Sequence, residues 1–156
     1  MKYIKTLLLT LLLMLAVTFA NAADLVENSI TDYLGFSVHN LTLTMDSGGA
    51  TAEAMSYAIN GTIIAVDTNP GTTAPTDNYD MTITNTDGVD IMGGALANRD
   101  TANSERAYPL ASAVVVEPPN TGILTINIAS GSNTATDPTV VLKIYTTDEK
   151  KGTLSW

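Results

Sequence analysis

Short stretches in which apolar and polar residues alternate recur along the chain and are separated by turn residues. The clearest are residues 123–129 (ILTINIA) and 139–146 (TVVLKIYT). Residues 36–45 also alternate, with a shift of phase near Asn40 that we interpret as a β-bulge. Further short strands are predicted at 53–59, 62–66, 79–86, 89–92, 106–110 and 113–117. Because Thr, Val and Ile favour strands and turn signals return about every ten residues, the pattern predicts an all-β chain. The expected fold is a single antiparallel β-sandwich of about seven to nine strands, immunoglobulin-like or jelly-roll-like.

The dipeptide Asn60-Gly61 is the strongest short-range turn signal. Asn-Gly favours a type I′ hairpin, which would pair residues 55–59 with residues 62–66. Both faces of that hairpin are apolar, so we expect it to be central in a sheet or part of an interface. Ile63 and Ala65 are the interface candidates on it.

A second turn is predicted at Asp87-Gly88. It would turn residues 79–86 back into residues 89–92, with Ile83 opposite Met92. Residues 93–103 are small and polar and are expected to form a loop.

The first 22 residues read as a secretory signal peptide. Lys2 and Lys5 precede an apolar run of 14 residues, and Ala20-Asn21-Ala22 supplies a cleavage site. The run is shorter than the ~20 residues that span a bilayer, so a membrane anchor is the weaker interpretation. We therefore expect cleavage after Ala22, a 23–35 N-terminal segment, a 36–147 sandwich and a 148–156 tail, with no membrane contact after cleavage. The mature protein would be periplasmic, cell-surface or extracellular.

Composition narrows the functional classes. The chain has 156 residues, no cysteine, 16 acidic and 7 basic residues, and a formal charge of -9. Loss of Lys2 and Lys5 with the leader leaves five basic residues and a charge of -11. One domain with a real core is expected. Thiolate metal sites and cysteine nucleophiles are excluded, and so negative a chain is not expected to bind nucleic acid.

No catalytic constellation stands out, and we expect a protein that is not an enzyme. His39 is the single histidine and lies inside a strand pattern. A Ser-His-Asp set would need it beside a serine on a sharp turn, and no G-x-S-x-G occurs. We therefore expect His39 to be a surface or rim residue.

Four aspartates near turns are the candidate metal ligands. Calcium binds hard oxygen ligands of this kind, although the distal glutamate of a calcium loop is missing. The simpler interpretation is that these side chains bond their own backbone in turns. The four residues are Asp77, Asp80, Asp87 and Asp90. No other cofactor is expected.

Aromatic residues bear on the choice of partner. A sugar-binding module usually shows a platform of exposed aromatic rings, whereas most tyrosines here lie in phase with core positions, so we expect them to pack inside. Trp156, at the apolar end of the tail, is a candidate anchor for an assembly contact or could dock on its own sandwich.

One stretch resembles a known group of proteins. Residues 74–80 (APTDNYD) lead into 81–84 (MTIT), and residues 87–94 (DGVDIMGG) and 97–101 (ANRDT) follow. This resembles small, uncharacterised β-sandwich proteins encoded among tailed-phage and prophage structural genes, over roughly residues 57–145. The resemblance implies a virion surface or accessory role and carries no catalytic residues. The leader departs from that pattern, because virion proteins assemble in the cytoplasm.

These observations predict an exported, non-enzymatic structural or interaction β-sandwich that acts in a surface or extracellular assembly or as a phage-derived, virion-associated accessory module. Its partners would be proteins or further copies of itself. The alternative is a cell-surface module that binds carbohydrate or calcium, with a surface glycan as partner. A hydrolase using two carboxylates ranks below both.

Overall fold

The computed structural model describes residues 24–45, 53–110, 122–129 and 137–147. These residues contain no helix, and so none long and apolar enough to cross a membrane. They form eight strands: β1 (Asp24–Tyr33), β2 (Phe36–Thr44), β3 (Glu53–Ile59), β4 (Thr62–Pro70), β5 (Asp80–Thr84), β6 (Glu105–Ala107), β7 (Gly122–Ala129) and β8 (Thr139–Thr147). The prediction of an all-β chain with antiparallel pairing is confirmed.

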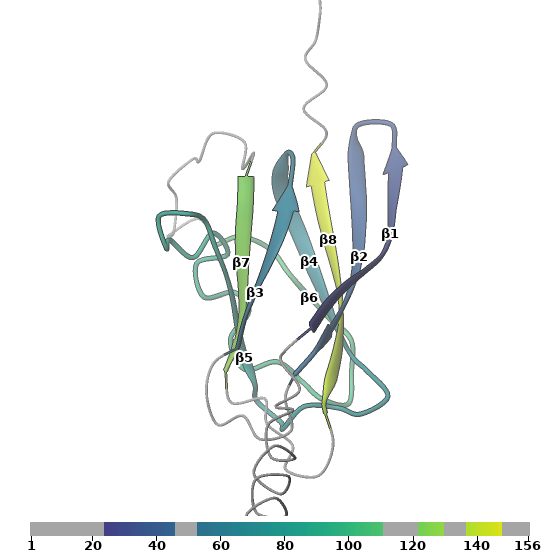
Figure 1. Cartoon of the computed structure of the whole chain (residues 1–156), viewed down its shortest axis with the longest axis vertical. Coiled ribbons are helices and arrows are strands. Elements are labelled where there is room, and N and C mark those ends of the chain that lie inside the picture. Colours follow the sequence, from purple (N-terminus) through teal and green to yellow (C-terminus); the bar gives the residue numbers. More distant parts are fainter. Residues whose placement is uncertain (1–23, 46–52, 111–121, 130–136, 148–156) are drawn as a thin grey trace, which may run out of the picture.

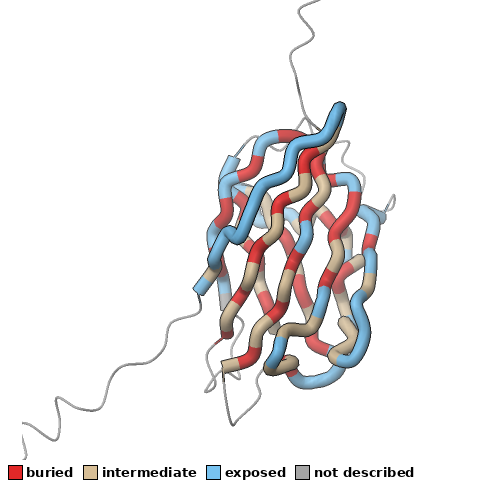
Figure 2. The backbone as a smooth tube through the Cα atoms, turned by 90° about the vertical axis from the view of Figure 1, so that its right-hand side faces the viewer, coloured by how far each residue is buried: buried red, intermediate tan, exposed pale blue. Residues whose placement is uncertain are grey.

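The strands form two sheets that enclose one core (Figure 1). The five-stranded sheet has the order β1-β2-β8-β4-β6, and the three-stranded sheet has the order β3-β7-β5. β8 lies between β2 and β4, so it joins strands from the first half of the chain. β1 forms one edge of the larger sheet, where almost all of its length is exposed (Figure 2).

Three of the strand pairs are nested, one outside the other, around the turn between Thr84 and Asp90. Thr84, at the end of β5, bridges Asp90 across the turn. Outside that bridge β4 pairs with β6, β3 with β7, and β2 with β8. The chain is therefore a long antiparallel ribbon whose successive pairs alternate between the two sheets.

Strict alternation builds the core. In β7 the inward residues Leu124, Ile126 and Ile128 are buried, and β8 contributes Val140, Leu142 and Ile144. Since side chains on one face of a strand recur every second residue, these apolar positions meet between the sheets. Both strands were predicted to within one residue of their ends.

The Asn60-Gly61 hairpin prediction is wrong. β3 and β4 belong to different sheets, and Ile59 pairs with Gly122 while Thr62 pairs with Thr147. The dipeptide makes a corner between the sheets. Gly61 has φ of 116°, and a Cβ there would collide with the Thr147 carbonyl oxygen, so glycine is needed for close approach as well as for its dihedral angle.

The bulge predicted in residues 36–45 is also wrong. β2 alternates without interruption, and the register shifts occur in β1, between Glu27 and Ser29, and in β4, between Ile63 and Ala65. The apparent phase shift arose because polar Ser37 and His39 occupy inward positions in β2. The 23–35 segment, to which no strand was assigned, contains β1.

The Asp87-Gly88 turn is confirmed. Gly88 has φ of 79°, and the Asn85 carboxamide oxygen accepts hydrogen bonds from the backbone N–H groups of Asp87 and Val89. The strand predicted at 89–92 is reduced to a single bridge between Asp90 and Thr84. The Ile91 N–H donates to Ile83 O, so Ile83 faces Ile91 and not Met92, one residue from the predicted register. The leader, the strand predicted at 113–117 and Trp156 lie outside the described residues.

Candidate functional site

The outer face of the five-stranded sheet bears a groove of about 480 Å³ over β1, β2 and β8. The side chains that line it are those that alternation turns away from the core. They are Ser29, Thr31, Tyr33, Phe36, Val38, Asn40, Lys143 and Tyr145. The volume lies within the range typical of small-ligand sites.

The strand register orders these side chains in rows across the sheet. Tyr33 lies opposite Phe36 at one end, and Thr31, Val38 and Tyr145 form the middle row. Ser29, Asn40 and Lys143 form the third row. Rows two residues apart along a strand are separated by about 7 Å, so the groove runs for roughly 14 Å.

An aromatic pair closes the first end of the groove. The Tyr33 and Phe36 rings stack with centroids 4.7 Å apart and an interplanar angle of 14°. Tyr33 is 49% exposed, so one side of the pair meets solvent. Tyr108 is also exposed and Tyr145 lines the groove, so the expectation that most tyrosines pack in the core holds for Tyr57 and Tyr79 but not for the other three described tyrosines.

A polar cluster fixes Tyr145 at the other side of the groove. The Arg106 guanidinium binds both Asp67 carboxylate oxygens, at 2.5 and 2.7 Å. The Tyr145 hydroxyl donates to Asp67 Oδ2 at 2.9 Å and accepts from Arg106 Nη2 at 3.0 Å. The Arg106 cation also lies 4.7 Å from the centre of the Tyr145 ring. These contacts hold the ring in one orientation.

The same cluster shifts the ionisation of its members. Hydrogen bonding from Arg106 lowers the pKa of Asp67, while burial and the Asp67 carboxylate raise the pKa of Tyr145. Asp67 is thus ionised at neutral pH and its charge is matched by Arg106. Lys143, which pairs across the sheet with Asp67, forms no ion pair with any described residue.

His39 is not at the surface, contrary to the sequence prediction. It is 6% exposed and points between the sheets. Its Nδ1 lies 2.9 Å from the Tyr57 hydroxyl, and its Nε2 lies 3.3 Å from Thr146 Oγ1. Tyr57 in turn donates to Glu27 Oε2 at 2.8 Å. Because Tyr57 gives its one proton to Glu27, His39 Nδ1 must be the donor to the Tyr57 oxygen.

This chain of side chains spans four strands, from β1 through β3 and β2 to β8. Burial, with a further contribution from Glu27, raises the pKa of Tyr57 well above its usual value. The partners of His39 are hydroxyl groups on opposite sheets, so the histidine ties the sheets together. The signal in the sequence was the uninterrupted alternation of Ser37, His39, Leu41 and Leu43.

Three of the candidate calcium ligands accept hydrogen bonds from other described residues. Asp80 Oδ1 accepts from the Asn98 N–H, and the two Asp90 oxygens accept from the Met92 and Gly94 N–H groups. Asp77 Oδ2 accepts a long bond of 3.4 Å from the Asn78 side chain. In the described part of the chain no three histidine or acidic side chains gather closely enough to hold a metal ion. The bonds of Asp90 fit the turn interpretation, whereas Asp80 lies in β5 and bonds a loop 18 residues further along the chain.

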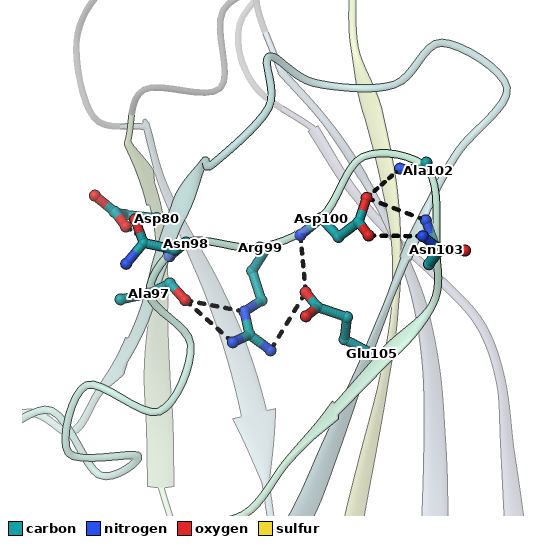
Figure 3. Close-up of polar contacts among 8 residues, drawn as sticks. All are labelled: Asp80, Ala97, Asn98, Arg99, Asp100, Ala102, Asn103 and Glu105. Carbon is teal, nitrogen blue, oxygen red and sulfur yellow. Dashed lines mark hydrogen bonds and ion pairs between the residues drawn. The ribbon is translucent and has the colours of Figure 1, made fainter.

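Hydrogen bonds and an ion pair also hold the loop between β5 and β6 (Figure 3). Arg99 donates to the Ala97 carbonyl and forms an ion pair with Glu105 at 3.6 Å. Asp100 accepts from the backbone N–H groups of Ala102 and Asn103. The side chains of Arg99 and Asp100 therefore bond to residues of this loop and of the adjoining end of β6.

The two interface candidates on β4 are buried. Ile63 is 5% exposed and belongs to the core, and Ala65 is 6% exposed beside Tyr145. Burial leaves both with little surface for a partner. The bulge residue Ile64 between them is the more exposed one.

Comparison with known proteins finds no relative of this chain. No family model matches the chain, and neither a curated protein nor a solved structure does.

Proposed function

We propose that this protein is an exported, non-enzymatic β-sandwich that acts by binding at a cell surface or in an extracellular assembly. The observation that supports this best is the groove on the outer face, which combines the partly exposed Tyr33–Phe36 ring pair with hydroxyl, amide and ammonium groups. Histidine is the residue that most often acts as a general base, and His39, the single histidine, lies in the core and not in this groove. Such a surface is suited to recognition.

We infer that the sandwich is of the jelly-roll type. The order β2-β8-β4-β6 facing β3-β7-β5 follows from nested pairs wrapped into two sheets, with β1 added at one edge. Jelly rolls occur in viral capsid proteins and in lectins, so the topology accords with both an accessory role in a phage-like assembly and a binding role. Fold alone does not decide between them.

Two substitutions on opposite sheets test the binding role. Val38→Glu places a charge on the floor of the groove, and Thr82→Glu places the same charge on the outer face of the three-stranded sheet. The purified protein is sedimented alone and with cell envelopes of the producing organism. Self-association or envelope retention that Val38→Glu abolishes and Thr82→Glu preserves is the expected result.

The proposal fails if the protein is strictly monomeric and no surface material retains it. It also fails if both variants behave like the unmodified protein, because the groove would then not be the contact. Circular dichroism of both variants shows that each is folded.

A further inference from the structure

We infer that the groove binds an acidic oligosaccharide, with a sugar ring stacked on Tyr33 and Phe36 and an anionic substituent held by Lys143. This inference rests on the proposed function and names its ligand class. The shared chemistry is a pyranose chain bearing carboxylate or sulfate groups.

The arrangement of aromatic and polar groups points to a sugar. A pyranose has apolar C–H faces, which pack on aromatic rings, and hydroxyl edges, which need hydrogen-bond partners. The exposed side of the Tyr33–Phe36 stack supplies the first, and Ser29, Thr31 and Asn40 supply the second.

Asn40 has an acceptor that the described residues leave unused. Its Oδ1 is buried in the floor of the groove and has no hydrogen-bond partner among them. Buried acceptors without partners are rare in folded proteins. A hydroxyl-rich ligand that turns the carboxamide toward itself would supply the missing donor.

Charge distinguishes an acidic from a neutral sugar. The chain has 16 acidic residues against 7 basic ones, yet no carboxylate lines the groove and a lysine does. Asp67, which pairs with Lys143 across the sheet, is held by Arg106, so the charges of Asp67 and Arg106 cancel. The lining of the groove therefore carries one positive charge, that of Lys143. A groove of opposite sign to the rest of the molecule favours an anionic ligand.

The test compares three tetrasaccharides by isothermal titration calorimetry: tetragalacturonate, a sulfated heparin tetrasaccharide and neutral cellotetraose. The variants are Lys143→Gln, the charge-conserving Lys143→Arg, Tyr33→Ala and the control Tyr108→Ala. Tyr108 is as exposed as Tyr33 but does not line the groove.

At least one anionic tetrasaccharide is expected to bind more tightly than cellotetraose, with affinity that falls as salt is added. Lys143→Gln should weaken that binding roughly fivefold and Lys143→Arg should restore it. Tyr33→Ala should weaken it by about tenfold, and Tyr108→Ala should leave it unchanged. The relative affinities of the uronate and the sulfated sugar identify the anionic group.

The inference is overturned if no tetrasaccharide binds, or if cellotetraose binds as well as the anionic sugars and Lys143→Gln changes nothing. In either case the Val38→Glu sedimentation experiment still decides separately whether the groove is a contact surface. Failure of the sugar inference is thereby distinguished from failure of the proposed function.

Discussion

Replacing Tyr57 by phenylalanine tests whether the buried polar chain holds the two sheets together. Tyr57 is 7% exposed, and its hydroxyl contacts both His39 and Glu27. Phenylalanine keeps the ring that packs in the core and removes only the hydroxyl. The variant therefore isolates the hydrogen bonds from the packing.

The expected cost follows from the two partners that are left. His39 stays buried and loses the Tyr57 hydroxyl as a hydrogen-bond partner, which costs about 1–3 kcal/mol. Glu27 is exposed, so water replaces the lost donor at little cost. The free energy of unfolding should fall by about 2 kcal/mol, and Tm by roughly 4–8 °C for a chain of this length.

Tyr79 provides the matched control. It is a fully buried tyrosine whose hydroxyl lies near Thr68 without the geometry of a hydrogen bond, and neither hydroxyl has a partner among the described residues. Tyr79→Phe should be neutral or stabilising, because it removes a desolvated polar atom that gains nothing in the folded state. Urea unfolding followed by circular dichroism measures both variants. The hydrogen bonds of Tyr57 would have no such role if Tyr57→Phe were as stable as the unmodified protein. The same conclusion would follow if both variants lost the same free energy of unfolding.

Three further predictions concern the corner at Gly61, the cluster of Asp67, Arg106 and Tyr145, and stability at alkaline pH. Gly61→Ala should lower Tm by several degrees or prevent folding, because the new Cβ meets the Thr147 carbonyl at a strained φ; thermal unfolding measures it. The lowered pKa of Asp67 adds stability above about pH 4 that is lost as pH falls. Asp67→Asn should therefore cost about 1 kcal/mol at pH 7 but nothing near pH 2, in urea titrations at both values. Burial raises the pKa of Tyr79 to about 12, so stability should fall as pH rises above 10, by roughly 1.4 kcal/mol per pH unit. Tyr79→Phe should reduce that fall, and a parallel decline in both proteins would contradict it.

The local alternation of apolar and polar residues was sufficient to predict some elements of the fold and insufficient to predict others. β7 and β8 were predictable because each has one apolar face and ends in turn residues. The role of Asn60-Gly61 was not, because a hairpin and a corner between sheets have the same local sequence. The partners that decide between them, Gly122 and Thr147, are distant in the chain.

The groove could not be predicted for a related reason. Its residues come from β1, β2 and β8, which the register brings together from the two ends of the described chain. In β1 the bulge between Glu27 and Ser29 shifts the alternation, so no single phase of apolar residues identifies that strand. Surface chemistry built across three strands depends on register, and register is a property of the whole fold.

The nested order of the strand pairs also dictates when the fold can be completed during synthesis. The innermost turn can form as soon as it leaves the ribosome, but the outermost pair joins Phe36 to Thr147. Until β8 is made, β2 and β4 each lack the neighbour that lies between them. Pairing over such sequence distances is slow, on the scale of milliseconds to seconds. The five-stranded sheet therefore cannot be completed until Thr147, at the end of the described chain, has been made.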